Sequence, residues 1–403
     1  MIIHIDIDSF FASVEISLRP AIVNREVLVA HPEGMVLAAN YNAKRKGVKT
    51  TDLASKALKM LNKPMLFNVR YGAYQLASEY FFESLRTILS GYKNSKMLQI
   101  SIDECFIELT TPLQEGELLD LKNIIFEMTN LPVSIGAGSS KLIAKQASKR
   151  AKPFGVLLIS KDEELDFLKS FELSQLWGFG PKTIEKLRSV GIESVNDLLL
   201  SKKSKILGLD ILTLKNQLFD CILESESLGR SISVERSFRK GFTDPAQLNR
   251  AFDEIFNNLA FRFKESGLGF KNFELRVYLS DGSALIFKHK ERQHTANINL
   301  LAYEAFKAKT AFRNINITQI RRVGMSLSNL SPSENLELFT DYPIYEIEPP
   351  RYTLLELIYY GMRVSHLNFG EGRIIELRDD CLVIEFSDRK RIIADYSSLL
   401  FSY

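Results

Sequence analysis

The chain has 403 residues, which exceeds the size of one ordinary hydrophobic core and predicts two to four domains. Its hydrophobic share of 45% and charged share of 25% are typical of a soluble globular protein and, together with 27 Phe and 14 Tyr, disfavour a disordered chain. The net charge is +3, and three widely spaced cysteines exclude a disulfide framework and disfavour a structural zinc site.

The N-terminus lacks the basic region of a secretory signal, and no uncharged apolar run approaches the length of a membrane span. We therefore expect a cytoplasmic protein with no membrane partner. Charge is distributed unevenly, because residues 231–330 hold 16 Lys and Arg against 9 Asp and Glu, whereas the remainder holds 36 against 40. Such a basic segment is typical of a polyanion-binding module, although a solvated basic face gives the same pattern.

The first 160 residues are predicted to form an α+β domain, a sheet backed by helices. Isoleucines alternate with polar residues over 2–7, which indicates a strand, and Asp8 and Ser9 are expected to cap the short helix that follows. Period-2 and helical spacings predict the remaining elements. The strands are expected at 25–30, 35–39, 132–137, 155–160 and, as a pair, within 97–109, and the helices at 71–90, 117–130 and 139–150.

The rest of the chain is predicted to hold three further segments. Residues 163–225 are expected to be mostly helical, and residues 329–352 contain four prolines and are expected to be a linker. Turn signals between short apolar runs over 361–400 predict a small β-barrel. Between these, an α+β segment is expected with strands at 231–242, 272–279, 284–289 and 317–328 and helices at 247–266 and 300–312.

Three acidic residues interrupt apolar strands. Asp6 lies on the polar face of the first strand, and Asp103 and Glu104 lie where the run LQISIDECFIEL breaks its alternation. Buried carboxylates are costly unless they are paired or bind metal, and converging carboxylates are the hard oxygen ligands that magnesium takes in nucleotidyl transfer. Each motif alone is also explained by helix caps at Asp6 and Asp8, or by a tight turn at Asp103 and Glu104.

Four motifs follow one another along the chain. They are IIHIDIDSFFASVE at 2–15, LAANYNAKRKGV at 37–48, SIDECFIEL at 101–109 and VSIGAGSSKLIAKQASKRAKPFGV at 133–156. In this order they resemble the motifs of Y-family DNA polymerases of the bacterial DNA polymerase IV type, and the resemblance covers residues 1–340 approximately. It implies an error-tolerant, lesion-bypassing DNA polymerase without proofreading, which copies a primed DNA template in DNA repair.

The resemblance implies a catalytic metal site. Asp6, Asp103 and Glu104 match the residues that bind two magnesium ions, and the carbonyl of Ile7 is expected to complete one metal shell. Asp8 is expected to be a helix cap and not a ligand.

The resemblance also implies how the deoxynucleoside triphosphate is bound. Phe11 matches the steric gate, an aromatic ring that leaves no room for a ribose 2′-hydroxyl. The alternative is that Phe11 is a core residue, but the neighbouring Phe10 suits the core better; Phe10 is also counted with the nucleotide-binding residues. The positions that grip the triphosphate are matched by Tyr41, Lys44, Arg45 and Lys152.

Three positions depart from the usual pattern of these polymerases. Lys44 stands where relatives usually have Arg, so either Arg45 compensates or nucleotide affinity is weaker. Leu37 and the run KTTDLAS at 49–55 also differ, which leaves the template-base preference undecided but not the reaction.

The implied fold class is α+β multidomain, a right-hand polymerase with a small C-terminal β-barrel. The expected boundaries are 1–10 and 71–162 for the palm, 11–70 for the short fingers, 163–228 for the helical thumb, 229–330 for the α+β little finger, 331–352 for a linker and 353–403 for the barrel.

Two segments are expected to contact DNA. In the thumb, Gly178 and Gly180 precede a helix with Pro181 at its first position, which resembles a helix-hairpin-helix motif whose helix N-terminus and Lys182 meet a phosphate. A plain turn between helices is the alternative. In the little finger, the basic residues expected to contact phosphates are Arg236, Arg239, Lys288, Lys290, Arg321 and Arg322.

The C-terminal part of the chain carries two docking signals. The run NLELF at 335–339 resembles a clamp-binding peptide, in which Leu336, Leu338 and Phe339 would fill apolar pockets of a sliding clamp. Residues 361–399 resemble the Tudor- or SH3-like barrel of UvrD-type helicases, although the chain has no GxxxxGK[ST] loop. The barrel is expected either to dock an unknown protein or nucleic acid or to be purely structural.

Two other classes of function compete with this one. A non-catalytic DNA- or clamp-binding factor on a polymerase scaffold is disfavoured because all three carboxylates and Phe11 are present. A reverse transcriptase or RNA polymerase is disfavoured by the aromatic ring at Phe11, which would exclude ribonucleotides.

Overall fold

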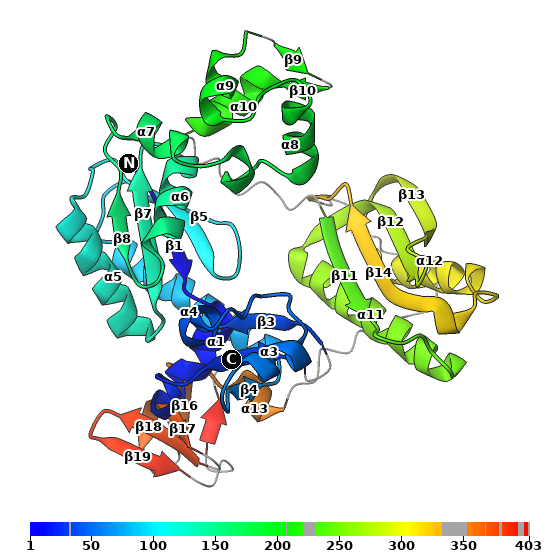
Figure 1. Ribbon diagram of the computed structural model, residues 1–403. Coiled ribbons are helices and arrows are strands. Elements are labelled where there is room, and N and C mark those ends of the chain that lie inside the picture. The colour runs from blue at the N-terminus through cyan, green and yellow to red at the C-terminus, as the bar shows by residue number, and fades with distance from the viewer. Residues whose placement is uncertain are drawn as a thin grey trace. The chain divides into compact units, whose positions relative to one another are not determined.

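The computed structural model describes residues 1–31, 34–202, 204–206, 208–220, 231–332, 353–366, 368–378, 381–393 and 399–401. The chain divides into two units, one formed by Met1–Glu224 with Thr353–Tyr403 and the other by Ser225–Tyr352. Figure 1 shows both, coloured from blue at the N-terminus to red at the C-terminus. Each unit has its own core and is described by itself. No helix in the described ranges has the length and hydropathy that crossing a membrane requires.

A five-stranded sheet is the centre of the first unit. Its order is β5-β6-β1-β7-β8, and all neighbours are antiparallel except β7 and β8. The strands are β1 (Ile2–Ile7), β5 (Lys96–Gln99), β6 (Glu104–Glu108), β7 (Val133–Gly138) and β8 (Val156–Leu158). As predicted, the isoleucines at 3, 5 and 7 share one face and belong to the main core. The central strand is nevertheless buried on both faces, because Ile2 packs on the other side with Phe106 and Ala144.

Helices cover the two faces of this sheet. α4 (Tyr71–Leu89) and α5 (Glu115–Thr129) supply core residues to the isoleucine face, and α6 (Lys141–Ala151) contacts β7, β1 and β8. α6 approaches closely because Gly136 has no side chain, and a Cβ there would lie 2.0 Å from the backbone nitrogen of Ser148. This close packing brings the basic residues of α6 and its C-terminal end to the polar face of β1.

A small three-stranded sheet, β3-β2-β4, lies between β1 and α4 in the sequence. Its strands are β2 (Val27–Ala30), β3 (Val36–Ala39) and β4 (Met65–Phe67), and the helices of this segment are α1 (Phe10–Ser17), α2 (Tyr41–Arg45) and α3 (Ala54–Met60), with a short 3-10 turn at Pro20–Ile22. α1 packs against β2, β3 and α4, so it joins the small sheet to the large one.

The predicted cap of α1 is wrong. α1 begins after Ser9, whose backbone is left-handed at φ 51°, and no side chain caps this helix. The carboxylate of Asp8 is buried and accepts hydrogen bonds from the Phe154 amide at 2.6 Å and the Ser134 hydroxyl at 2.9 Å. The local capping signal is overridden because tertiary packing offers this carboxylate better donors from distant parts of the chain.

The segment after β8 is mostly helical, as predicted. It contains α7 (Glu164–Lys169), α8 (Pro181–Arg188), α9 (Val195–Leu200) and α10 (Ile211–Leu218), a 3-10 turn at Leu173–Gln175 and the two-residue strands β9 (Lys205–Ile206) and β10 (Leu209–Asp210). Gly178 has φ +89°, Gly180 is the N-cap of α8, and Pro181 is its first residue. The predicted turn and helix start are therefore confirmed.

The C-terminal module, residues 353–403, belongs to the first unit. It contains α13 (Leu354–Leu357) and an antiparallel sheet of order β19-β18-β17-β16-β20. The strands are β16 (Arg363–His366), β17 (Gly370–Arg378), β18 (Cys381–Phe386), β19 (Lys390–Ile393) and β20 (Leu399–Phe401). The module is fixed to α1, because the Leu377 amide donates to the Leu18 carbonyl at 2.7 Å and Leu18 lies in the core of the module.

The second unit is an α+β layer of one sheet and two helices. The sheet has the order β11-β14-β12-β13, with β15 beside β12. The elements are β11 (Ser231–Ser237), α11 (Pro245–Ser266), β12 (Leu268–Leu279), β13 (Ala284–Thr295), α12 (Ile298–Ala311), a 3-10 turn at Ile317–Gln319, β14 (Ile320–Ser328) and β15 (Ser331–Pro332). Both helices pack on the same apolar face of the sheet, and no helix or strand among the described residues of this unit covers the other face, which is called the open face below. The palm, fingers and thumb boundaries drawn from the sequence stay predictions.

Candidate active site

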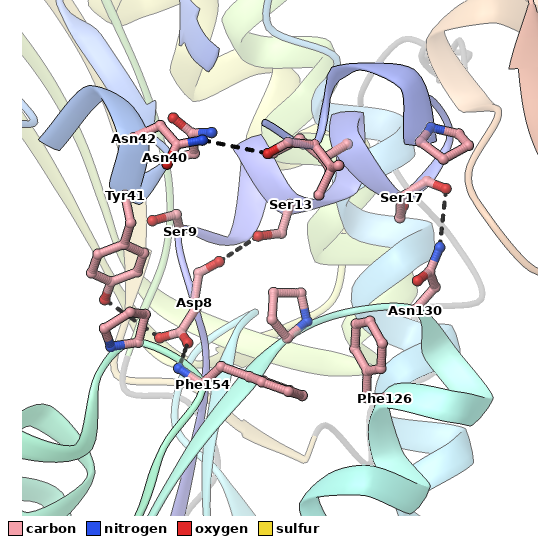
Figure 2. A pocket seen from close by; sticks show the side chains of 15 residues that line it. Asp8, Ser9, Ser13, Ser17, Asn40, Tyr41, Asn42, Phe126, Asn130 and Phe154 are labelled. Atoms are coloured by element: carbon pink, nitrogen blue, oxygen red, sulfur yellow. Dashed lines mark hydrogen bonds between the residues drawn. The ribbon is translucent and has the colours of Figure 1, made fainter. Parts of the chain in front are cut away.

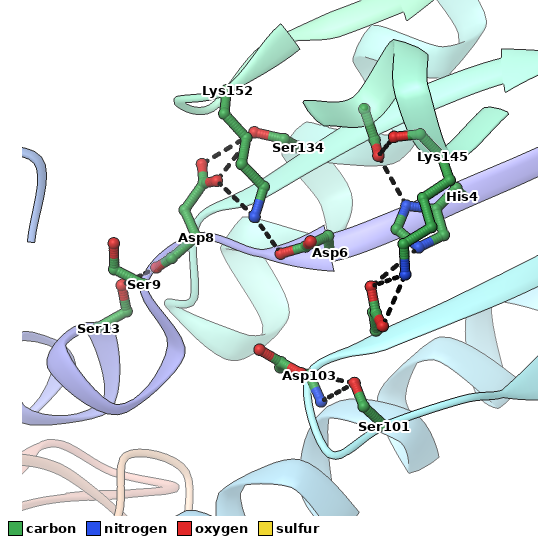
Figure 3. Close-up of polar contacts among 12 residues, drawn as sticks. His4, Asp6, Asp8, Ser9, Ser13, Ser101, Asp103, Ser134, Lys145 and Lys152 are labelled. Carbon is green, nitrogen blue, oxygen red and sulfur yellow. Dashed lines mark hydrogen bonds and ion pairs between the residues drawn. The ribbon is translucent and has the colours of Figure 1, made fainter. Parts of the chain in front are cut away.

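The three predicted carboxylates lie at one end of the large sheet. Figure 3 shows Asp6 and Asp103 there, and Glu104 is the first residue of β6 at the same end. Strand pairing places Asp6 of β1 opposite Glu104 of β6. Asp103 immediately precedes β6, and its carbonyl accepts a hydrogen bond from the Ile7 amide at 2.9 Å. Two neighbouring strands thus bring together residues that lie about a hundred positions apart in the sequence.

Each of the three carboxylates has its own partner. The Lys152 ammonium binds Asp6, the Lys145 ammonium binds both oxygens of Glu104 at 2.8 and 2.9 Å, and the Ser101 hydroxyl donates to Asp103 at 2.6 Å. Two lysines therefore neutralise two of the three negative charges.

The buried His4 supports Glu104 from behind. Its Nε2 lies 3.2 Å from a Glu104 oxygen, and its Nδ1 lies 2.7 Å from the hydroxyl of Ser148 on α6. Burial raises the pKa of Glu104, but the nearby His4 ring and Lys145 ammonium outweigh burial and hold that pKa at about 2. Glu104 is therefore a fixed negative charge at neutral pH.

Asp6 is in the opposite electrostatic situation. Burial, opposed by Lys152 and reinforced by Asp103 and Glu104, raises the pKa of Asp6 to about 6. A carboxylate with a raised pKa among other carboxylates is a site where an additional cation is favourable.

The donor set fits hard divalent cations. Three carboxylates and the nearby carbonyl of Ile7 are the oxygen ligands that Mg²⁺ prefers. As the side chains lie, no three Asp, Glu, His or Cys groups in the described ranges are gathered closely enough to hold a metal ion. Asp6 and Glu104 each bind a lysine, so a metal would have to replace these ammonium groups.

Asp8 has a positioning role that the sequence interpretation missed. Its carboxylate is 2% exposed and binds Phe154, Ser134 and, at 3.8 Å, Lys152. Because it holds the backbone two residues after Lys152, Asp8 fixes the segment that places this lysine against Asp6. Nothing in the sequence near Asp8 indicated these distant partners.

Three of the four predicted triphosphate-binding residues lie together. Lys44 lies 4.7 Å from the centre of the Tyr41 ring and donates to the Ser9 hydroxyl at 2.8 Å. Burial and the neighbouring Lys152 lower the pKa of Lys44. Arg45 lies apart from this cluster, because its exposed guanidinium donates to Asn42 at 3.1 Å.

The two adjacent phenylalanines have different places. Phe10 is buried in the main core, whereas Phe11 is only partly buried and stacks on Tyr74 at 4.3 Å between ring centres. Tyr71, which is 61% exposed, meets the Phe11 ring edge-on at 6.2 Å. The sequence interpretation identified Phe11 but missed both tyrosines, which the helical spacing of α4 places on the same side of that helix.

An apolar pocket of about 420 Å³ adjoins the cluster formed by Tyr41, Lys44 and Lys152 (Figure 2). Asp8, Ser9 and Tyr41 line it on one side, and Phe126 and Phe154 are among its apolar walls. The hydroxyl of Ser13 donates to the Asp8 carbonyl at 2.5 Å on its floor. Asp8 and Tyr41 therefore belong to both the pocket and the polar cluster.

The predicted DNA contacts of the second unit fall on two different faces of the sheet. Residues 322, 324, 326 and 328 alternate with the buried residues of β14, so Arg322 lies on the open face, where it is 3.9 Å from the Tyr278 ring and pairs with Glu235. Lys288 and Lys290 share this face. Arg236 pairs with Val323 and lies on the helix-covered side, where it binds Glu254 of α11. Arg321 lies at a break in the register of β14 and donates to the Thr318 carbonyl.

The remaining predicted contacts have these places. Lys182 is exposed in the first turn of α8, and Arg239 is exposed after β11. Arg276 on the open face was missed, although the alternation of β12 could have indicated it. The clamp-binding residues Leu336, Leu338 and Phe339 lie outside the described residues.

Two family models match the chain, and together they cover more than half of it. The description "impB/mucB/samB family" matches residues 5–149, and "impB/mucB/samB family C-terminal domain" matches residues 229–338. The chain belongs to the impB/mucB/samB family. Together with the relatives and solved structures that follow, this membership confirms the resemblance drawn from the four motifs.

Relatives of this impB/mucB/samB family protein are similar over most of their length. "DNA polymerase IV" of Treponema denticola is 29% identical over 87% of this chain and 92% of its own, and that of Oceanobacillus iheyensis is 27% identical over 93% of both. A solved "Y-family DNA polymerase chimera Dbh-Dpo4(243-245)-Dbh" matches 82% of this chain and 98% of its own, with a TM-score of 0.67 and 23% identity. The "Insertion ternary complex of Dbh DNA polymerase" matches with a TM-score of 0.56 and 21% identity over the same shares. These structures establish the fold.

Proposed function

We propose that this family member is a template-directed DNA polymerase that adds deoxynucleotides to a primer 3′ end during translesion synthesis. The observation that carries the proposal is the pairing of Asp6 with Glu104 across two strands, with Asp103 beside them and Lys152 against Asp6. The relatives named DNA polymerase IV support the same activity.

Asp6, Asp103 and Glu104 would hold two Mg²⁺ ions, and the Ile7 carbonyl would add a ligand. When bound, such ions neutralise phosphate charge and lower the pKa of the attacking hydroxyl. The protein supplies the rigid frame for these ligands, because β1 and β6 are paired and His4 restrains Glu104 from the α6 side.

Lys152, Lys44 and Tyr41 would bind the triphosphate of the incoming nucleotide. In the structure the Lys152 ammonium binds Asp6 and lies near Asp8. A triphosphate carries a denser negative charge than one carboxylate does. The Lys152 ammonium would therefore move from Asp6 to the triphosphate, and Asp6 would be free to bind metal. Burial lowers the pKa of Lys44, but the triphosphate charge would favour its protonated form.

Phe11 would select the sugar. Its ring is held against Tyr74 by stacking, so it cannot turn away easily from a ribose 2′-hydroxyl. Rejection of ribonucleotides would then follow from steric exclusion.

Primed DNA would bind through basic residues of both units. On the open face of the second unit these are Arg276, Lys288, Lys290 and Arg322, and in the first unit the N-terminus of α8 with Lys182 is suited to a phosphate. A sliding clamp would bind residues 335–339. The few, widely spaced cysteines support a reducing, cytoplasmic compartment for this activity.

A single-nucleotide extension assay tests the reaction. The protein is mixed with Mg²⁺ and a primed template, and each deoxynucleotide is supplied separately on templates that differ in one base. Extension should be fastest with the complementary nucleotide on each template. Binding of primed DNA without extension would instead favour a non-catalytic DNA-binding factor.

A further inference from the structure

The ring of Phe11 depends on Tyr74 for its position. The two rings are nearly parallel, with an interplanar angle of 13° and 4.3 Å between their centres. Tyr74 is fully buried, so it is the fixed member of this pair, while Phe11 is partly exposed. Whatever fixes Tyr74 also fixes Phe11.

Tyr74 is held by a buried carboxylate. Its hydroxyl donates to Glu15 at 2.9 Å, and Glu15 also accepts from Arg19 at 2.6 Å and from Arg70 at 2.8 Å. The Glu15 side chain has no exposed surface. A buried carboxylate needs such donors, because an unpaired one would be strongly destabilised. Burial and the Glu15 charge raise the pKa of Tyr74, so its hydroxyl stays a donor.

Arg70 connects this carboxylate to the C-terminal module. Its Nε binds Glu15, while its Nη1 donates to the carbonyls of Leu355 at 2.7 Å and Ile358 at 2.9 Å. The planar guanidinium is thus fixed between the two sites, which suits arginine better than lysine. These carbonyls lie 285 and 288 positions further along the chain.

The C-terminal module packs tightly against α4 beside Arg70. Ile358 is fully buried, and Tyr359 packs against Tyr80 of α4 at 5.8 Å between ring centres. Gly361 has φ +90°, and a Cβ there would lie 2.6 Å from the Tyr80 ring. The module also lies beyond both segments that the family models match, so this contact is an addition to the part that defines the family.

We propose that the C-terminal module acts on nucleotide selection, because it positions Phe11 through Arg70, Glu15 and Tyr74. This inference rests on the proposed role of Phe11 in excluding ribonucleotides. Arg70 is a positioning residue that touches no substrate. Loss of its carbonyl partners frees the guanidinium, weakens the restraint on Glu15 and lets the Tyr74–Phe11 stack move.

Kinetics of sugar selection test the proposal. Sugar preference is the ratio of kcat/KM for a deoxyribonucleotide to kcat/KM for the matching ribonucleotide. In Arg70→Ala and, separately, in Gly361→Val, we expect this ratio to fall about tenfold. For the deoxynucleotide, the rise in KM should be larger than the fall in kcat. The sugar preference of Arg70→Lys should lie between that of these variants and that of the wild type. Arg86→Ala, at an exposed arginine of the same helix, is the matched control and should leave the preference unchanged.

The double variant Arg70→Ala with Gly361→Val decides whether the module acts through Arg70. If it does, the double variant should lose no more selectivity than Arg70→Ala alone, because both changes break one connection. Multiplied losses would overturn the proposal, since the module would then act by another route.

Hydrogen exchange supplies a readout that needs no activity. Gly361→Val should accelerate amide exchange in the module and also in α1 and the first turn of α4. Faster exchange in the module with unchanged exchange in α1 would overturn the proposal, even if Gly361→Val proved less stable. A wild type that extends no primer would contradict the proposed function alone, and the exchange data would still decide the positioning.

Discussion

Asp6 and Glu104 face each other across β1 and β6, yet they bind different lysines and their pKa values are shifted in opposite directions. The pKa of Asp6 is raised to about 6, whereas that of Glu104 is held at about 2. The difference has a structural cause, since Glu104 has both Lys145 and the imidazole of His4 beside it. Two lysines thus neutralise two of the three carboxylates, and under the proposed function metal and nucleotide would replace these pairs.

Replacement of Lys145 should make stability depend more strongly on magnesium. In Lys145→Gln, Glu104 loses its ammonium partner at a partly buried site, so the free energy of unfolding in EDTA should fall by about 1–2 kcal/mol. Mg²⁺ should restore more stability to this variant than to the wild type. Thermal unfolding with and without Mg²⁺ measures this, and an equal magnesium effect in both proteins would argue against the metal site.

Substitution of Phe11 should change sugar selectivity, whereas substitution of Phe10 should change stability. Phe11→Ala should admit ribonucleotides, raising their kcat/KM at least about tenfold, because the partly exposed ring is removed from the sugar site. Phe10→Ala is the paired control, since it empties a core position and should cost about 3–4 kcal/mol of stability. Unchanged sugar discrimination in Phe11→Ala would sink the gate assignment.

Substitution of Lys44 should weaken nucleotide binding more than substitution of Arg45, although the two residues are adjacent and both basic. Lys44→Ala should raise KM for the nucleotide about tenfold, because Lys44 lies in the cluster with Tyr41 and Lys152. Arg45→Ala should change KM less than about threefold, because its guanidinium points to Asn42. Equal effects would mean that Arg45 turns into the site when nucleotide binds.

Asp8→Ala should weaken nucleotide binding without touching the metal ligands. The change leaves the partly buried Phe154 amide and the buried Ser134 hydroxyl without their acceptor, at a cost of about 1–3 kcal/mol in stability. KM should rise because the segment carrying Lys152 is loosened. Ser134→Ala removes only a neutral donor and should have the smaller effect in the same steady-state assay.

The two faces of the second unit should differ in DNA binding. The double variant Lys288→Ala with Lys290→Ala should reduce the slope of log affinity against log salt by about two, because both lysines lie on the open face. Arg236→Ala with Lys309→Ala removes the same charge from the helix-covered side, where both residues pair with carboxylates of α11, and should leave the slope nearly unchanged. Affinity titrations at several salt concentrations compare the pairs.

The sequence predicted most elements because their periodicity is strong. The alternation in β1 and the helical spacing of α4 placed both elements within a residue of their observed bounds. β13 was expected to end at 289 but continues to Thr295, since its polar residues lie on an edge strand and carry no apolar alternation. β12 likewise begins at Leu268, where β15 pairs with it.

Local signals failed where distant partners decide the structure. Asp8 reads as a helix cap, but its partners lie 126 and 146 positions away. The Glu15–Arg70 pair carried no signal at all, because only folding brings α1, α4 and the C-terminal module together. Arg236 was grouped with Lys288 by charge, and only the pleat of the sheet separates the two residues.

The most direct measurement of the central claim compares Asp103→Asn with Asp120→Asn, an exposed carboxylate on α5. Both proteins are tested for binding of primed DNA and for extension of it with Mg²⁺ and deoxynucleotides. We expect Asp103→Asn to bind DNA normally but to extend it at least about a thousandfold more slowly, while Asp120→Asn behaves as wild type. Extension by Asp103→Asn within about tenfold of wild type would contradict a nucleotidyl-transfer site built on Asp6, Asp103 and Glu104.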